Sequence, residues 1–408
     1  MRDTTSVCVV GLGYIGLPTA ATLAGAGHRV TGVDTNPSVV DTINGGGIHI
    51  VEPGLADLVH DGVSSGMLRA ERAPVSADTF LICVPTPLTP DGTTPTPDIG
   101  YVLSAARSIA PVLRPGNLVV IESTCPVGTT ERVRDELSQA GASLNGIRLA
   151  YCPERVLPGR ILYELVANDR IIGGLDAPSA EAAKRFYASF VTGALFTTDS
   201  RTAEMVKLVE NTFRDVNIAF ANEISVLSDH LALDPWEVID LANRHPRVQI
   251  LQPGPGVGGH CIAVDPWFIV AQDPETARLT RTARRVNDDK TDWVVQRIAE
   301  TATRLTSELD RPARVACLGL SYKPDVDDLR ESPSVRVALA LVARGIDVLA
   351  CEPHISSHPL LALVDAETAV AEADIVAALV RHTAFAKLDL AKTVVLDFCG
   401  LTVHFPGP

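Results

Sequence analysis

The stretch SVCVVGLGYIGLPTAATLAGAGHRVTGVD, residues 6–34, decides the fold class of the N-terminal third of the chain. Its first five residues, 6–10, form a short apolar run that predicts a buried strand. A glycine turn in GxGxxG spacing and a helix rich in small residues follow, and residues 28–34 predict a second strand that ends in an acid. This order of elements is the fingerprint of a dinucleotide-binding βαβ unit.

The glycines and the acid explain why such a unit binds a dinucleotide. Gly11, Gly13 and Gly16 have no side chains, so a pyrophosphate can approach the helix N-terminus, where free N–H groups favour an anion. Asp34 can accept hydrogen bonds from ribose hydroxyls and would repel a 2′-phosphate. We therefore expect NAD rather than NADP, against the alternative of a purely structural glycine turn.

Polar residues follow several later apolar runs of the same αβ pattern. Thr86 follows ADTFLICV, Thr124 follows NLVVIES, and Glu154 and Arg155 follow GIRLAYC. Ligands of open α/β sheets bind beyond the carboxyl ends of the strands, so these side chains can face a cofactor or a substrate. The alternatives are a turn or cap hydroxyl for each threonine, and a surface ion pair for Glu154 and Arg155.

The pattern changes near residue 200, where helical spacing runs for about thirty residues with almost no breakers. A helix of this length usually bridges domains or forms a dimer interface, and a second long helical region is predicted over residues 276–308. The first helix has apolar residues that can share one face: Met205, Leu208, Val209, Thr212 and Phe213.

The same helix carries Lys207, Asn211 and Arg214 at spacings i, i+4 and i+7, so these three side chains point one way. They could face a phosphorylated or sugar ligand. A solvated helix face is the alternative.

The stretch PGPGVGGHCIAVDPW, residues 253–267, presents Cys261 on backbone that is nearly free of side chains. His260 precedes this cysteine and Asp265 lies four residues after it. A thiol in such a place, with an acid nearby, is a candidate nucleophile, and the basic residues of 243–248 (NRHPRV) would favour its thiolate form. The alternative is a tight turn whose cysteine is a small buried hydrophobe.

The αβ pattern returns after residue 310, without a glycine fingerprint, which favours a nucleotide-diphosphate site over a dinucleotide site. The expected fold class is α/β, with two Rossmann-like doubly wound domains joined by a central long-helix dimerisation region. The expected domains are an NAD-binding domain (1–199), a central helical domain with the cysteine loop (200–309) and a second Rossmann-like domain for a nucleotide diphosphate (310–408).

Composition excludes several partners. The formal net charge of −14 over 408 residues disfavours nucleic acid and anionic membranes. The eight cysteines are scattered without a CxxC pair, which indicates reduced cytoplasmic thiols and no metal site. Neither a signal-peptide pattern nor a membrane-length apolar run is present.

Seven stretches together resemble the UDP-glucose/GDP-mannose dehydrogenase family, which oxidises nucleotide sugars to uronic acids. They span nearly the whole chain in order: GLGYIGLP, VPTP, STCPVGTT, CPERVLPGR, TAEMVKLVENTFRDVNIAFANE, NRHPRVQILQPGPGVGGHCIAVDPW and GLSYKPDVDDLRESP. The resemblance implies a four-electron oxidation with two NAD, through a thiohemiacetal and a thioester on Cys261. Within the family the chain most resembles members that act on UDP-N-acetyl-D-mannosamine, with UDP-N-acetyl-D-glucosamine as the alternative substrate.

Two other classes stay open: a non-catalytic sensor of nucleotide sugar or NAD, and a simple two-electron dehydrogenase. The resemblance also implies that residues 310–408 form the UDP-sugar-binding domain and that the chain forms a homodimer through the central helices. One departure is DFCGL, residues 397–401, which lacks the basic residue that relatives often place there. This puts one phosphate or sugar contact in doubt.

By the same resemblance, site residues fall into three groups. The catalytic residues would be Cys261, Lys207, Glu154, Asp265, Thr124 and Asn211. The NAD-binding residues would be Gly11, Gly13, Tyr14, Ile15, Gly16, Asp34, Thr86, Thr124 and Arg330. The substrate-binding residues would be Arg155, Val156, Lys207, Asn211, Arg214, His245, Arg247, Gly258, Tyr322 and Lys323.

Overall fold

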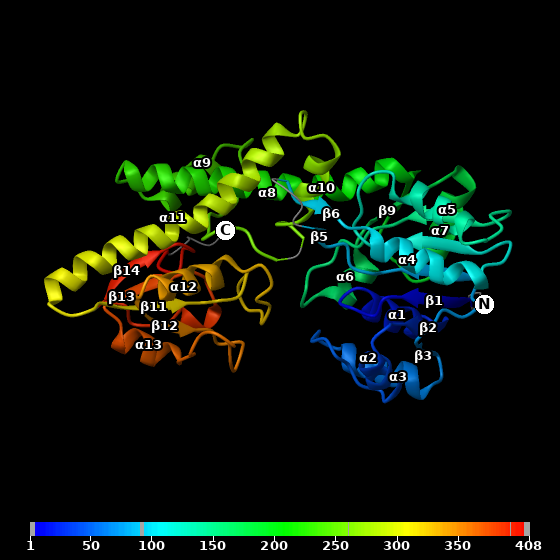
Figure 1. Cartoon of the computed structure of the whole chain (residues 1–408), viewed down its shortest axis with the longest axis horizontal. Coiled ribbons are helices and arrows are strands. Elements are labelled where there is room, and N and C mark those ends of the chain that lie inside the picture. Colours follow the sequence, from blue (N-terminus) through cyan, green and yellow to red (C-terminus); the bar gives the residue numbers. More distant parts are fainter. Residues whose placement is uncertain (1–4, 90–93, 260, 392, 404–408) are drawn as a thin grey trace. The chain divides into compact units, whose positions relative to one another are not determined.

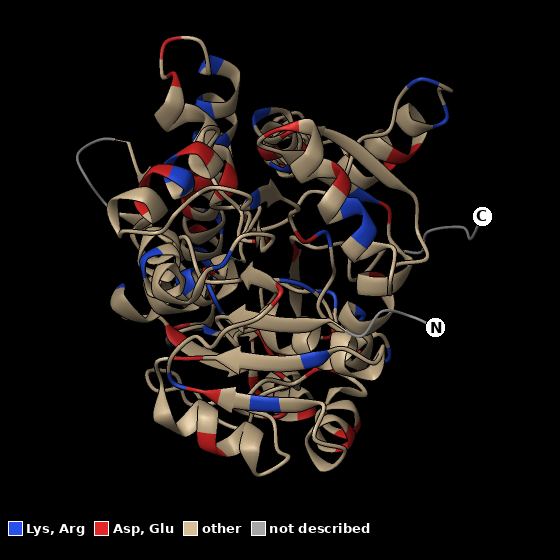
Figure 2. Ribbon diagram, turned by 90° about the vertical axis from the view of Figure 1, so that its right-hand side faces the viewer, with Lys and Arg blue, Asp and Glu red and all other residues tan. Residues whose placement is uncertain are grey.

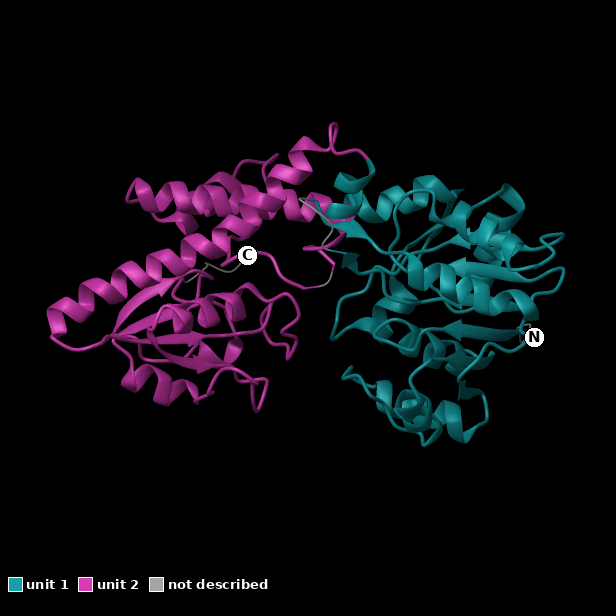
Figure 3. Cartoon of the chain, viewed as in Figure 1, with its two compact units in different colours: residues 1–209, 267–272 teal, residues 210–266, 273–408 magenta. Residues whose placement is uncertain are grey.

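The computed structural model describes residues 5–89, 94–259, 261–391 and 393–403. The chain divides into two compact units (Figure 3). The first unit comprises residues 1–209 and 267–272, and the second comprises residues 210–266 and 273–408. The division into three domains at residues 199 and 309 stays a prediction.

The first unit is built on an eight-stranded sheet (Figure 1) in the order β10-β9-β8-β7-β4-β1-β2-β3. Its strands are β1 Ser6–Val10, β2 Arg29–Val33, β3 Leu68–Glu71, β4 Thr79–Ile82, β7 Leu118–Ile121, β8 Arg148–Tyr151, β9 Arg170–Gly174 and β10 Leu195–Asp199. Neighbours pair in parallel, except that β8 pairs with β9 in antiparallel orientation. The predicted doubly wound fold is confirmed, and the reversed pair is a feature that the sequence did not indicate.

Helices cover both faces of this sheet. One apolar cluster takes residues from α1 (Gly16–Gly25), α3 (Leu55–Ser64) and α7 (Ala177–Tyr187), and another takes residues from α4 (Gly100–Ile109) and α5 (Thr129–Gln139). The remaining elements between these strands are α2 Pro37–Asn44, α6 Ile161–Ala167, the short 3₁₀ helix η1 Ala110–Val112 and the short antiparallel pair β5 Leu88–Thr89 and β6 Thr96–Pro97. Strands β1, β4 and β7 are neighbours and parallel, so the loops that follow them share one edge of the sheet.

Long helices confirm the predicted change of character after residue 200. Helix α8 spans Ser200–His230, beginning in the first unit and continuing into the second, and α11 spans Arg278–Leu309. Helix α9 (Pro235–Asn243) is capped by Asp234, which accepts from the Trp236 N–H at 2.8 Å, and α10 spans Asp265–Gln272.

A second, four-stranded parallel sheet ends the chain, in the order β12-β11-β13-β14. Its elements are β11 Arg314–Leu318, α12 Pro333–Ala343, β12 Asp347–Cys351, α13 Ala366–Glu372, β13 Ile375–Ala378 and β14 Val394–Asp397. Apolar clusters lie on its two faces, one with α12 and α11 and one with α13. The predicted second doubly wound domain is confirmed.

The five residues expected to share one face of α8 differ in their burial. Leu208 and Thr212 are buried, whereas Met205, Val209 and Phe213 are exposed. Residues four apart lie about 40° apart around a helix, and residues three apart about 60° apart. The edge of the packed surface can therefore pass between the row with Leu208 and Thr212 and the row with Met205, Val209 and Phe213.

Two features concern the distribution of charged and apolar residues along the chain. In Figure 2 the Lys and Arg positions are interspersed with Asp and Glu along helices and loops. None of the helices in the described part of the chain has the length and apolar character needed to span a bilayer.

Candidate active site

The glycine turn between β1 and α1 leaves space for a ligand. Gly11 has φ of 93°, and a Cβ on Gly16 would lie 1.7 Å from the Gly11 carbonyl oxygen, so both positions require glycine. A Cβ on Gly13 would meet no described atom within 4 Å. Ile15 is the N-cap of α1 without a side-chain hydrogen bond, and Tyr14 beside it is partly exposed. The turn therefore offers open space and helix N–H groups to a pyrophosphate.

Asp34 follows β2 and lies beside this turn. Its carboxylate accepts from the Leu12 N–H at 3.1 Å and from the Asn36 N–H at 2.9 Å. These bonds fix the carboxylate at the edge of the sheet, with lone pairs left for ribose hydroxyls. The residues of this half of the unit thus fit an adenine dinucleotide.

Hydrogen bonds connect the loops after β4 and β7. The Thr86 hydroxyl donates to the Thr124 carbonyl oxygen at 2.7 Å, so the structure brings these two predicted residues together. Sequence reasoning missed Glu204 on α8, which accepts from the Gly128 N–H at 2.6 Å and the Thr130 N–H at 2.8 Å. Glu204 therefore holds the loop that contains Thr124 against α8.

Glu154 is buried, so the alternative of a surface ion pair is wrong. Its carboxylate pairs with buried Arg170 of β9, which sequence reasoning also missed. The Arg155 guanidinium donates to the Asp169 carbonyl oxygen at 3.1 Å, and Val156 follows in the same loop. Lys207 of α8 is buried and its Nζ donates to the Glu154 carbonyl oxygen at 2.6 Å, which joins two predicted catalytic residues.

Glu122 is a second buried carboxyl near Glu154 and Arg170, and the sequence analysis did not predict it. It accepts from the Tyr187 hydroxyl at 2.6 Å and from the Cys83 thiol at 3.3 Å. Burial, together with the negative charge of Glu154, raises the pKa of Glu122 from 4.5 to about 7. Glu122 precedes Ser123 and Thr124, so an acid at the end of the apolar run NLVVIES was the signal for it.

In the second unit the structure brings together Asn211, Cys261 and Asp265. The Asn211 amide donates to the buried Asp265 carboxylate at 2.5 Å. The Cys261 carbonyl oxygen accepts from the Asp265 N–H at 2.8 Å and from the Val264 N–H at 3.0 Å, so the cysteine begins the turn into α10. Its side chain is partly exposed, and His260 lies outside the described residues.

The glycine segment before Cys261 lies against the loop after β11. A Cβ on Gly258 would lie 2.7 Å from the Glu331 carbonyl oxygen, and one on Gly259 would lie 2.9 Å from Tyr322 Cε2. The Gly259 N–H donates to the Arg330 carbonyl oxygen at 3.1 Å. The structure thus brings predicted residues from two distant parts of the sequence side by side.

The remaining predicted residues lie around this segment in the second unit. Lys323 Nζ lies 5.9 Å from the Tyr322 ring centroid, and the Arg330 guanidinium pairs with Asp328. Three basic residues are exposed, one on α8 and two after α9: Arg214, His245 and Arg247.

A dinucleotide-binding sheet and a separate thiol–amide–carboxylate group define a dinucleotide-dependent dehydrogenase. Family models match three successive parts of the chain: the NAD binding domain of the UDP-glucose/GDP-mannose dehydrogenase family at residues 5–191, its central domain at 201–289 and its UDP binding domain at 316–402. The chain belongs to the UDP-glucose/GDP-mannose dehydrogenase family, and it is an NAD-dependent nucleotide-sugar dehydrogenase.

Individual relatives match over nearly the full length. An NDP-N-acetyl-D-galactosaminuronic acid dehydrogenase of Ralstonia nicotianae is 53% identical, over 98% of this chain and 96% of its own. The UDP-N-acetyl-D-mannosamine dehydrogenase of Escherichia coli K12 is 51% identical, over 93% and 94%. A solved UDP-N-acetyl-mannosamine dehydrogenase from S. aureus matches with a TM-score of 0.87 at 43% identity, covering 97% of this chain and 95% of that one.

Replacing Glu122 by Gln should remove a pH dependence of stability. The folded protein holds the Glu122 proton more tightly than the unfolded chain, because the pKa is about 7 instead of 4.5. The stabilisation is complete below about pH 4.5 and is lost as the pH rises through about 7, by at most about 3 kcal/mol. Between pH 5 and 7.5 the unfolding temperature of the first unit should therefore fall more in the wild type than in Glu122→Gln. An equal fall of the unfolding temperature in the two proteins would contradict this assignment.

Proposed function

We propose that the chain oxidises UDP-N-acetyl-D-mannosamine at C6 to the uronate, in a four-electron reaction that uses two NAD. The observation that carries this proposal is the partly exposed Cys261 beside the Asn211–Asp265 pair, in a chain about half identical to UDP-N-acetyl-D-mannosamine dehydrogenases along its length. The galacto sugar is the second candidate, since a relative named for N-acetyl-D-galactosaminuronic acid is 53% identical. The gluco sugar is the third.

Cys261 explains how one site can pass from alcohol to acid. The glycine turn and Asp34 of the first unit would hold NAD, which would supply the hydride acceptor for each oxidation. After the first oxidation, the Cys261 thiolate adds to the aldehyde carbon and forms a thiohemiacetal. A second oxidation converts this adduct to a thioester, and water then releases the carboxylate and restores the thiol.

The other proposed catalytic residues differ in what they can contribute. Lys207 carries an ammonium group whose Nζ is fixed by the Glu154 carbonyl, so it can stabilise an oxyanion. Asp265 accepts from Asn211 and keeps lone pairs with which it can orient or deprotonate water. Glu154 is paired with Arg170, and its carboxyl group is proposed to transfer a proton. Thr124 lies in the loop at the end of β7, where it can contact nicotinamide and water.

Substrate binding is proposed for residues of both units. Tyr322, Lys323 and Gly258 form a surface of ring, ammonium group and bare backbone in the second unit, which suits uridine and diphosphate. Further contacts are proposed for Arg155, Val156, Lys207, Asn211, Arg214, His245 and Arg247. Arg330 is proposed to contact NAD.

The substrate proposal is tested by the yield of NADH per sugar nucleotide. We expect two NADH per UDP-N-acetylmannosamine, formed faster than with the gluco or galacto epimer, measured by NADH absorbance against sugar consumed. Two NADH with another epimer preferred would keep the mechanism and change the substrate. One NADH per sugar would indicate a two-electron dehydrogenase, and none from any epimer would favour a sensor.

Cys261→Ser tests the covalent mechanism. The serine hydroxyl is a far weaker nucleophile than a thiolate, so uronate formation should fall at least about a hundredfold. The control is Cys399→Ser, which alters another partly exposed cysteine of the second unit and should keep full activity. Uronate formation is measured by chromatography of the products. An unchanged rate in Cys261→Ser would contradict the thioester mechanism.

We further propose a homodimer formed through α8. Its second half and the residue just after it carry a row of partly or fully exposed apolar side chains, three or four residues apart as in helix–helix contacts: Phe213, Val216, Phe220, Ile224, Leu227 and Leu231. The exposed fraction is 66% for Phe213, 49% for Phe220 and 67% for Leu231, which is a large apolar area to leave in water. None of the eight cysteines, all of which lie in the described part of the chain, forms a disulfide, which suits a reducing, cytoplasmic compartment.

Phe220→Glu should dissociate this dimer, because it places a charge in the middle of the apolar row. The molar mass measured by light scattering after gel filtration should fall from two chains to one. Tyr163→Glu on α6 changes an exposed aromatic residue away from the row and should leave the mass unchanged. A dimer that survives Phe220→Glu would place the interface elsewhere.

A further inference from the structure

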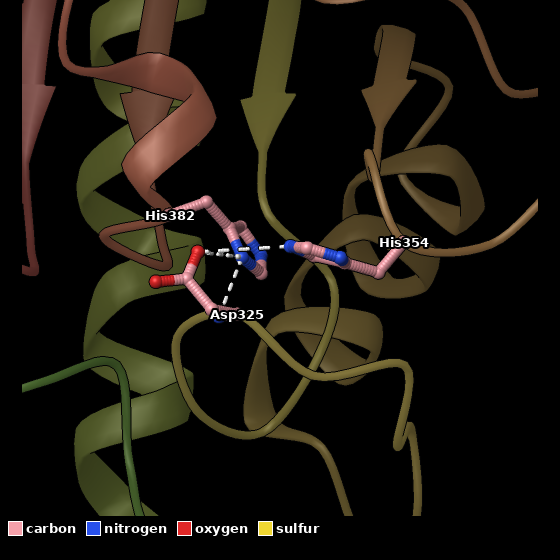
Figure 4. Close-up of side chains that lie close together, drawn as sticks. All are labelled: Asp325, His354 and His382. Atoms are coloured by element: carbon pink, nitrogen blue, oxygen red, sulfur yellow. Dashed lines mark hydrogen bonds and ion pairs between the residues drawn. The ribbon is translucent and has the colours of Figure 1, made fainter. Parts of the chain in front are cut away.

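Asp325, His354 and His382 lie together in the second unit (Figure 4), with possible ligand atoms within 4.8 Å of one another. Such a set suggests a metal site. The hydrogen bonds of His382 indicate another role. The Asp325 backbone N–H donates to its Nδ1 at 3.0 Å, and its Nε2 lies 3.0 Å from Glu352 Oε2. A backbone N–H can only donate, so Nδ1 supplies the lone pair and Nε2 carries the proton. Both nitrogens are used, and no lone pair remains for a metal.

This neutral ring lies where a loop is held at the edge of the C-terminal sheet. The loop, residues 319–332, follows β11, and β11 lies between β12 and β13 in the sheet. Glu352 follows β12 and His382 comes shortly after β13, so the two side chains flank the loop from both neighbouring strands.

Glu352 fixes the start of the loop. Its Oε2 accepts from the Leu320 N–H at 2.8 Å and from the Ser321 N–H at 2.9 Å, in addition to His382. Hydrogen bonds to His382 and to these two amides lower the pKa of Glu352, against the effect of burial. The carboxylate therefore stays ionised and links the start of the loop to the histidine.

Asp325 fixes the middle of the loop. It adopts φ of 58°, which is rare for a residue with a side chain, and its N–H donates to His382. Its carboxylate accepts from the Thr383 N–H at 2.9 Å and from the Thr383 hydroxyl at 2.6 Å, and these bonds lower its pKa. Residues 382 and 383 thus hold Asp325 on both its backbone and its side chain.

Between these two fixed points lie Tyr322 and Lys323, for which nucleotide binding is proposed above. A segment this short that is fixed at both ends has few conformations left, so little entropy is lost when a ligand orders it. The Tyr322 ring also lies against Gly259, two residues before Cys261. A change at His382 would therefore reach the nucleotide-binding side chains without touching the ligand.

We propose that His382 is a positioning residue for the nucleotide sugar, which acts by holding Asp325 and Glu352 so that Tyr322 and Lys323 are presented to the uridine diphosphate. The inference rests on the proposed function of this loop. It assigns the Asp325–His354–His382 cluster to hydrogen bonding and substrate order, with no metal ion.

Three replacements of His382 separate its two bonds. Asn has an oxygen near the place of Nδ1 and keeps the bond to Asp325, Gln has an amide that reaches toward Glu352, and Leu keeps bulk without either bond. His382→Leu should weaken UDP binding, measured by calorimetry, roughly tenfold, because a buried N–H and a carboxylate lose their partner. The KM for the sugar nucleotide should rise more than kcat falls, and NAD binding in the first unit should stay unchanged. His382→Asn should restore most of the UDP affinity, and His382→Gln less.

His354→Leu is the matched control. The His354 ring lies 4.9 Å from that of His382, and its Nε2 lies 3.6 Å from Asp325 Oδ1, which is longer than a hydrogen bond. Its hydrogen bond to Glu352 is made through its backbone N–H, which the replacement keeps. It should bind UDP as the wild type does, and EDTA should have no effect on either protein. Equal losses in His354→Leu and His382→Leu, or an effect of EDTA, would establish a metal site and overturn the proposal.

Two other results would also overturn it. If the wild type binds UDP and His382→Leu binds it equally well, His382 has no positioning role, and the proposed function is unaffected. Loss of NAD and UDP binding together would mean general damage to the fold. Failure of the wild type to bind UDP would instead reject the proposed function, and this inference with it.

Discussion

The position of Cys261 depends on a close contact between the backbone of the glycine segment before it and the loop after β11, a contact that leaves no room for a side chain. At Gly258 and Gly259 a Cβ would come within 3 Å of the Glu331 carbonyl and the Tyr322 ring. Real Cβ atoms are not found at such distances, so the two segments fit only while both positions are glycine. The candidate nucleophile and the loop proposed to bind the nucleotide are therefore placed by one contact, and a shift of either segment changes the other.

A buried polar network sets where that glycine segment begins. Asp215 of α8 accepts from Arg284 and Asn287 of α11 at 2.6 and 2.8 Å, Asn222 donates to Asn287, and Gly254 donates to Asn222. Burying an ion pair gains little stability, because desolvation offsets much of the attraction, but removing one partner leaves an uncompensated charge. The network therefore penalises any other register of α8 on α11, and the chain leaves this helix pair toward Cys261 from one defined place.

The sequence predicts what is local and misses what is distant. The first strand, glycine turn, helix and acid lie within residues 6–34, and each has a local signal, so the dinucleotide half could be predicted nearly complete. Glu122 and His382 act through partners far away in the chain: Tyr187 lies 65 residues from Glu122, and Asp325 lies 57 from His382. Arg170 is nearer to its partner Glu154, at 16 residues, but on another strand end. No spacing rule connects such pairs. The reversed β9 and the exposed row of α8 were missed for a related reason, because periodicity gives the angle between side chains but not which side of an element is covered.

Helix α8 gives a reason for the placement of two proposed catalytic side chains. Lys207 belongs to the first compact unit and Asn211 to the second, yet they lie one turn apart on a continuous helix. A helix rises about 1.5 Å per residue, so their separation along its axis stays near 6 Å. Lys207 is held by the Glu154 carbonyl and Asn211 by Asp265, so a hydrogen bond fixes each of the two side chains where it leaves α8. Two loops would not fix the spacing between the Lys207 amine and the Asn211 amide, whereas a continuous helix does.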